Sequence, residues 1–204
     1  MLFFDLSLAQ IAGIAVALVV GITFHEFSHA FIADQLGDDR PRALGRVSLN
    51  PIAHIDPVGA IVFVLAGFGW GKPVPVNVYA LRPGRIGMAL VAGGGPIANV
   101  AVAAVAAVIH RVLDIGGIGG FAMDVAFWIV LFNLLLAFFN LLPIPPLDGY
   151  NILLAFLPPQ AAFAVQRYAQ YGIIVLLLLV FLPNSPLDLL FGVVRWLTGV
   201  FIGG

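Results

Sequence analysis

The chain has 204 residues, of which 62% are hydrophobic and 9% are charged, and its formal net charge is −1. Soluble globular domains carry roughly 25% charged residues, so this composition excludes a water-soluble fold and predicts an integral membrane protein with lipid as its main solvent. The net charge argues against nucleic acid as a partner, and the absence of cysteine excludes disulfides, cysteine zinc clusters and thiol catalysis.

The first predicted element is a membrane-spanning helix over residues 8–33, which exceeds the ~20 apolar residues that a hydrocarbon core requires. Residues 45–79 then contain many glycines and prolines, a pattern typical of turns and short strands. We expect the strands at residues 47–49 and 74–78, where apolar residues alternate with small or polar ones. Residues 58–68 are apolar but short, so they predict a re-entrant or half-depth segment.

Two further spans are predicted at residues 86–109 and 121–142. A proline-rich run at residues 143–146 breaks the helix that precedes it, so we expect non-helical backbone at residues 147–149. The chain ends with two more apolar segments, at residues 162–182 and 187–202.

Together these segments predict an all-α polytopic membrane protein with about five membrane segments and a small re-entrant or β element between the first and second spans. No repeat or soluble domain interrupts them, so residues 1–204 are expected to form a single membrane domain. Basic residues cluster between the first two spans and mark the cytoplasmic side of the membrane: Arg40, Arg42, Arg46, Lys72, Arg82 and Arg85. This topology places the ends of the first and third spans at the cytoplasmic face.

The first predicted span contains the motif H-E-x-x-H, formed by His25, Glu26 and His29. Residues four apart share one helical face, so both imidazoles can bind one metal ion while Glu26 accepts a proton from water. A charged residue at the bilayer centre costs about 2.5–3.5 kcal/mol. Interhelical hydrogen bonds, at about 0.6–2 kcal/mol each, hardly offset this cost, whereas zinc ligation at about 10–16 kcal/mol does so easily. The motif therefore favours a zinc site over a polar cluster that only joins helices.

Catalytic zinc commonly takes two histidines and one carboxylate, and leaves a fourth position open. Asp148 is the best candidate for the third ligand, because it follows the proline-rich run at the membrane face where the H-E-x-x-H helix ends. Non-helical backbone at that depth is tolerated when it lines a cavity or is buried in protein. From the residues alone, an ordinary interfacial turn that ends in Asp148 is nearly as well supported.

Three motifs, FHEFSHA at residues 24–30, GGGPIAN at residues 93–99 and NLLPIPPLDG at residues 140–149, occur in an order that resembles the site-2 protease family of intramembrane zinc metallopeptidases. The resemblance implies that His25, His29 and Asp148 bind one zinc ion per chain and that Glu26 is the catalytic acid and base. It also implies membrane-spanning or membrane-associated protein substrates that enter from the lipid. The chain resembles a minimal form of the family, without a PDZ-like or nucleotide-sensing domain.

Two more polar residues are candidates for contact with substrate or with the developing oxyanion. Asn140 belongs to the third motif, and His54 lies in a stretch that resembles one found in compact relatives. Each has an equally simple structural interpretation, as an interhelical hydrogen-bonding group or as a residue of a turn. Gly93–Pro96 and Asn99, in the second motif, are interpreted as architectural, because small residues let membrane helices approach closely.

The sequence therefore predicts an intramembrane zinc metalloendopeptidase, with a compact form that would suit a prokaryotic inner membrane and a site nearer the cytoplasmic face. Two alternatives of other classes remain: a metal transporter that uses the same His and Asp residues, and a catalytically silent adaptor that binds membrane segments. A third, an unrelated membrane zincin that processes lipidated proteins, is disfavoured by the LDG motif at residues 147–149. A transporter would place polar ligands at several depths, and a silent relative commonly lacks the motif glutamate, which is present here as Glu26. The sequence carries no signal for the oligomeric state.

Overall fold

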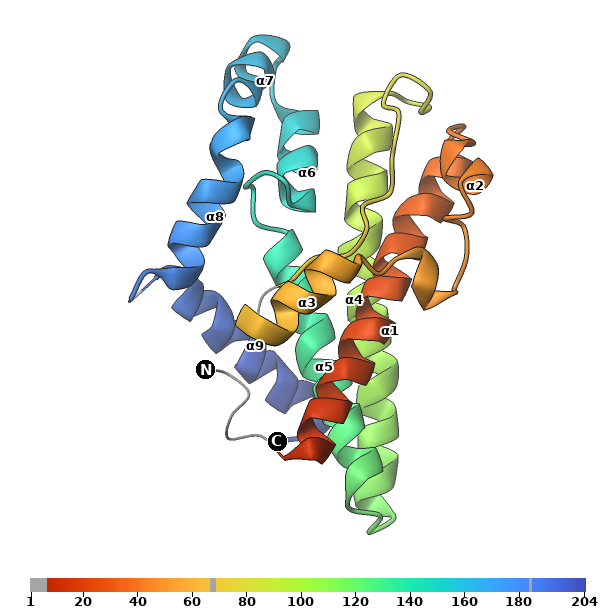
Figure 1. The fold of residues 1–204 in the computed structure, drawn as a ribbon, viewed down its shortest axis with the longest axis vertical. Coiled ribbons are helices and arrows are strands. Elements are labelled where there is room, and N and C mark those ends of the chain that lie inside the picture. The colour runs from red at the N-terminus through yellow and green to blue at the C-terminus, as the bar shows by residue number, and fades with distance from the viewer. Residues whose placement is uncertain (1–6, 67–68, 184) are drawn as a thin grey trace.

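The computed structural model describes residues 7–66, 69–183 and 185–204, and this part of the chain is mainly helical (Figure 1). Its α-helices are α1 (Leu8–Gln35), α2 (Arg40–Ala43), α3 (Pro57–Ala66), α4 (Arg85–Ile115), α5 (Phe121–Asn140), α6 (Asp148–Phe156), α7 (Pro159–Gln166), α8 (Gly172–Phe181) and α9 (Leu187–Ile202). Two 3-10 turns, η1 (Pro51–Ala53) and η2 (Ala169–Tyr171), lie between them. The predicted all-α architecture is confirmed.

Helices α1, α4 and α5 pack against one another and form the centre of the molecule, with α9 against α5 (Figure 1). Small residues line these contacts: Ala17, Ala30, Ala33 and Ala103 are fully buried. Because small side chains let helix axes approach closely, polar groups on α1 can reach partners on α4 and α5. The three-helix unit thereby creates the surroundings of the candidate site.

Three helices are long and apolar enough to cross a membrane, namely α1, α4 and α5, and they correspond to the first three predicted spans. Helices α7 and α8 with η2 form a pair bent by 42° that would make a fourth span if it crosses as one unit. Helix α9 has 16 residues, which at 1.5 Å per residue gives about 24 Å, short of the ~30 Å hydrocarbon core. The described residues thus contain three or four candidate spans, and the expected number of about five is not confirmed.

The strands expected at residues 47–49 and 74–78 are absent, and the described residues there form bends, turns and irregular backbone. One isolated antiparallel bridge joins Ile55 to Gly71. The physical reason is that side chains bind the backbone groups that a strand would offer to a neighbour. In the first segment His54 Nε2 lies 2.6 Å from the Ser48 carbonyl, and in the second the Asp38 carboxylate accepts from the backbone N–H of Asn77.

The short apolar segment expected at residues 58–68 is helical in its described part, as α3, and residues 67–68 lie outside the described residues. In Figure 1, α3 crosses in front of the central helices. The proline-rich run ends α5 near the predicted position, but the backbone does not stay non-helical up to residue 149. Helix α6 starts at Asp148, because the free N–H groups of a first helical turn favour a carboxylate there.

Candidate metal centre

His25 and His29, one turn apart on α1, face Asp148 at the first residue of α6. The His25 Nε2 and His29 Nε2 atoms are 3.0 Å apart, and Asp148 Oδ2 lies 3.1 Å from the first and 3.3 Å from the second. Both histidines are buried and Asp148 is nearly so. In the described part of the chain these residues form the one group of three or more His, Asp or Glu side chains placed to hold a metal ion.

Hydrogen bonds on the far side of each imidazole fix which nitrogen faces the cluster. His29 Nδ1 lies 2.7 Å from the carbonyl oxygen of Val91, which can only accept, so Nδ1 carries a proton and, in the neutral ring, Nε2 carries a lone pair. His25 Nδ1 lies 2.7 Å from Asn99 Oδ1, which also accepts. Two neutral imidazoles in this tautomer point their lone pairs at one carboxylate oxygen, and such an arrangement favours a metal cation between them.

The donor set fits zinc. Ligands at the ~2.0–2.1 Å distances of tetrahedral zinc are about 3.3 Å from one another, close to the separations in this triangle. Asp148 Oδ2 is buried and has no hydrogen-bond partner, as expected if the neighbouring Nε2 atoms carry no protons. Two histidines and a carboxylate make a ligand set that leaves the fourth zinc position open for water or substrate.

Helix α4 contacts this cluster directly through Gly95. A Cβ atom on Gly95 would lie 2.6 Å from His29 Nε2 and 2.7 Å from His25 Nδ1, far inside van der Waals contact. The second motif was interpreted as architectural, and the structure confirms the close helix approach. It adds that the surface approached is that of the two imidazoles.

Glu26 lies on α1 beside the cluster, with its side chain 13% exposed and its Oε2 atom 3.8 Å from Arg46 Nη2. Arg46 is 5% exposed, and its guanidinium also donates to the carbonyls of Lys72 and Pro73. Burial lowers the pKa of Arg46 from its usual value, and the Glu26 carboxylate opposes that shift. An arginine stays charged after such a shift, so Arg46 supplies the positive charge that accompanies Glu26.

The two weaker candidates are placed differently. His54 is fully buried, its Nε2 lies 2.6 Å from the Ser48 carbonyl, and its Nδ1 has no hydrogen-bond partner. It is not a member of the metal-binding group. Asn140 donates to the carbonyl of Leu136 in its own helix, at 2.9 Å. Roles for both residues in catalysis stay predictions.

Sequence reasoning missed the amide side chains behind His25. Asn99 was interpreted as architectural, yet it binds His25, and Asn133, which was not considered, binds Asn99 at 2.9 Å. Both amides are fully buried. The available signal was an uncharged polar side chain inside an apolar span, because such groups face the protein interior and find partners there.

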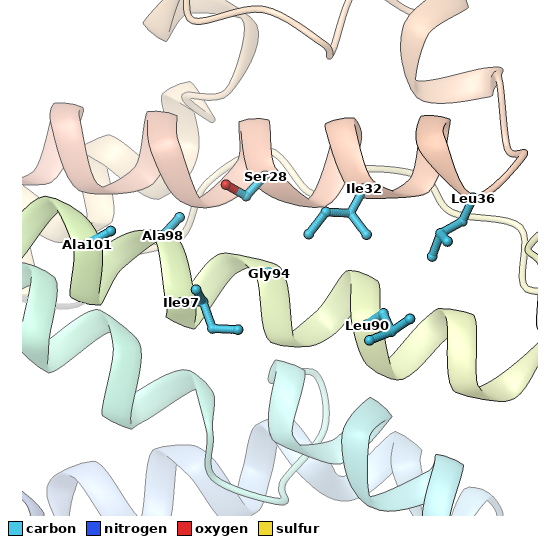
Figure 2. Close-up of a pocket in the computed structure, with 8 residues that line it drawn as sticks. All are labelled: Ser28, Ile32, Leu36, Leu90, Gly94, Ile97, Ala98 and Ala101. Carbon is cyan, nitrogen blue, oxygen red and sulfur yellow. The ribbon is translucent and has the colours of Figure 1, made fainter.

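An apolar groove of about 390 Å³ lies between α1 and α4 (Figure 2). It is lined by Ser28, Ile32, Leu36, Leu90, Gly94, Ile97, Ala98 and Ala101. Two of these residues directly precede His29 and Gly95, but no ligand atom lines the groove. The groove is therefore a feature of the apolar helix surface and not the metal site itself.

The sequence is similar to known proteins over most of its length. The sequence pattern of Peptidase family M50 matches residues 118–182, which include Asp148. The protein named "Putative zinc metalloprotease YwhC" of Bacillus subtilis is 38% identical over 189 residues, which cover 89% of this chain and 85% of that protein. The chain belongs to peptidase family M50, the site-2 protease family. The resemblance seen in the three motifs is confirmed.

Two further relatives of this M50 peptidase carry the same kind of name. "Putative zinc metalloprotease Rip2" of Mycobacterium tuberculosis (strain H37Rv) is 33% identical over 196 residues, 91% of this chain and 74% of that protein. "Putative zinc metalloprotease MJ0611" of Methanocaldococcus jannaschii is 31% identical over 147 residues, 68% of this chain and 67% of that protein. No solved structure matches the chain. The M50 peptidase is a zinc metalloprotease and an integral membrane protein.

Proposed function

We propose that this M50 peptidase is an intramembrane endopeptidase in which His25, His29 and Asp148 hold one zinc ion and Glu26 transfers the proton. The observation that carries the proposal is the buried triangle of two imidazole nitrogens and one carboxylate oxygen, with edges of 3.0–3.3 Å, next to Glu26 on the same helix. These atoms come from α1 and α6, which are far apart in the sequence, and converge with their lone pairs facing inward.

When bound, zinc supplies a Lewis acid that polarises a carbonyl and lowers the pKa of water to about 7. Glu26 accepts the proton of the water that attacks the scissile carbonyl, and then delivers that proton to the leaving amine nitrogen. Arg46, 3.8 Å from the Glu26 carboxylate, compensates its charge in a poorly solvated place. Asn99 and the Val91 carbonyl hold the two imidazoles so that each Nε2 faces the proposed zinc position.

The substrates we propose are proteins that span or adhere to the membrane and enter from the lipid. The support is that the two histidines lie within α1, a helix of 28 residues that is long and apolar enough to cross a bilayer. They lie in its second half, close to the end that Arg40 and Arg42 follow. Because basic residues mark the cytoplasmic side, we place the site nearer that face of a prokaryotic inner membrane.

We further infer that residues 1–204 act as a single membrane domain, with α3 resting at partial depth in the bilayer. Helix α3 has 10 residues, or about 15 Å of helix, half of what a crossing requires. Val58 and Ile61 on α3 are each 60% exposed, which suits contact with lipid.

The test compares wild type with Glu26→Gln, both purified in detergent as the full chain and supplied with zinc. Zinc content and cleavage of a protein that carries a transmembrane segment are measured. We expect one zinc per chain in both proteins and a loss of cleavage of about 100- to 10,000-fold in the variant, because the amide cannot accept a proton.

The possible results separate the alternatives. A wild-type protein that takes up no zinc would overturn the assignment of the ligands. Undiminished cleavage by Glu26→Gln would remove the proposed role of Glu26. Zinc in both proteins, with cleavage by neither, would favour the adaptor or the transporter over the protease.

A further inference from the structure

Two buried amide side chains form a continuous hydrogen-bonded chain behind His25. Asn133 Nδ2 on α5 donates to the Ile129 carbonyl at 2.9 Å, and Asn133 Oδ1 accepts from Asn99 Nδ2 on α4 at 2.9 Å. Asn99 Nδ2 also donates to the Gly21 carbonyl on α1 at 3.0 Å, and Asn99 Oδ1 lies 2.7 Å from His25 Nδ1. Both amides are 0% exposed, so water cannot replace any of these partners.

The direction of every hydrogen bond in this chain is fixed by backbone carbonyls at its ends. The Ile129 carbonyl can only accept, so the Asn133 amide group must point its NH₂ there and its oxygen toward Asn99. The oxygen of Asn133 and the carbonyl of Gly21 both accept from the NH₂ of Asn99. The one position left for the Asn99 oxygen is opposite His25 Nδ1, which must therefore carry the proton.

We propose that Asn99 and Asn133 are positioning residues that hold His25 in the tautomer with a proton on Nδ1, so that Nε2 presents its lone pair to zinc. Asn99 acts by direct contact, and Asn133 acts only through Asn99. The proposal rests on the proposed role of His25 as a zinc ligand. Outer partners of metal-binding histidines fix ring orientation in this way, and their removal typically weakens metal affinity about 10- to 100-fold.

The structure distinguishes this role from simple attachment of helices. His29 obtains the same tautomer from the backbone carbonyl of Val91, which no substitution can remove. His25 has no such carbonyl and depends on a side chain from α4. An amide that only joined helices would not need its oxygen directed at a metal ligand. We therefore expect substitution of the amide side chains to disturb the orientation of His25 and to leave His29, whose partner is a backbone carbonyl, in place.

The experiment measures the zinc dissociation constant of the full chain in detergent, by competition with a chelator, together with the melting temperature of the zinc-free protein. Wild type is compared with Asn99→Ala, Asn133→Ala and the double variant. The matched control is Thr198→Val, because Thr198 is buried and its hydroxyl donates to the Val194 carbonyl of its own helix at 2.8 Å, away from the metal-binding group.

We expect zinc affinity to fall about 10- to 100-fold in Asn99→Ala, by less in Asn133→Ala, and not at all in Thr198→Val. In the double variant, loss of Asn133 should add nothing to the loss of Asn99, because its path to His25 is already broken. A purely structural role would lower the melting temperature of the zinc-free protein and leave the zinc affinity as in wild type.

Unchanged affinity in folded Asn99→Ala would overturn the proposal, and so would an equal effect of Asn133→Ala in both backgrounds. If Asn99→Ala does not fold, Asn133→Ala alone decides: weaker zinc binding supports the chain of positioning contacts, and unchanged binding rejects it. Failure of the proposed function gives a different result, since the wild-type protein would then bind no zinc.

Discussion

Replacing Gly95 by alanine should weaken zinc binding sharply while leaving the helix that carries it intact. The added Cβ would lie 2.5 Å from His25 Cε1, 2.6 Å from His29 Nε2 and 2.7 Å from His25 Nδ1, whereas ordinary contact begins at 3.4 Å. The imidazoles must therefore shift by about 0.7–0.9 Å, several times the ±0.2 Å within which ligand distances normally vary. An overpacked interior costs about 1–3 kcal/mol. At about 1.4 kcal/mol per tenfold change, zinc affinity should fall about 5- to 150-fold.

The matched control for this substitution is Gly93→Ala on the same helix. A Cβ at Gly93 meets no atom within 4 Å. Both substitutions gain the same helix propensity, about 0.5–1 kcal/mol for Gly→Ala in a helix interior, so their difference isolates the collision with the imidazoles. Zinc affinity is measured by chelator competition and helicity by circular dichroism. Wild-type affinity in Gly95→Ala, or an equal loss in Gly93→Ala, would refute the reasoning.

Two other predictions concern charged groups next to the membrane helices. Arg46→Ala should reduce cleavage by up to about 100-fold with zinc content unchanged, because the Glu26 carboxylate loses the cation that neighbours and positions it. Turnover and zinc content are measured, with Arg42→Ala, at a more exposed arginine, as the control. Equal turnover in the two variants would contradict this prediction. The second prediction concerns stability against acid. The Arg40 guanidinium lowers the pKa of the Asp38 carboxyl, and burial opposes that shift. Because the folded pKa lies below the unfolded value of about 3.9, the stabilisation is present above that pH and is lost as the pH falls through the folded pKa. Asp38→Asn should therefore lower the melting temperature at pH 7, and the difference from wild type should shrink as the pH falls below about 3.9. A difference that is constant with pH would count against this prediction.

The membrane helices were predictable because hydropathy is a local property of the chain. Helices α1, α4 and α5 coincide closely with the three spans predicted from runs of apolar residues. The short strands at 47–49 and 74–78 were predicted wrongly from an equally local alternation. A strand exists only if a neighbouring strand pairs with its backbone, and here side chains bind backbone groups of both segments instead: His54 lies 2.6 Å from the Ser48 carbonyl, and Asp38 accepts from the N–H of Asn77.

The helix boundaries around Asp148 were also predicted only in part. The proline-rich run correctly predicted the end of α5, because proline cannot continue a helix. The start of α6 at Asp148 was missed, because a helix can begin as soon as the prolines end and a carboxylate favours its first turn. Helix boundaries are set by such small local differences in free energy and are difficult to read from a pattern.

The sequence by itself determined that His25 and His29 share one face of an apolar helix with Glu26 beside them, because a spacing of four residues fixes that geometry wherever the helix lies. Only the tertiary structure decided what surrounds them. Asn99 lies 74 residues from His25 along the chain, and Asp148 is farther still. No local pattern encodes such contacts. They depend on how α4 packs against both α1 and α6. Gly95 on α4 permits the close approach to α1 by leaving room for the two imidazoles.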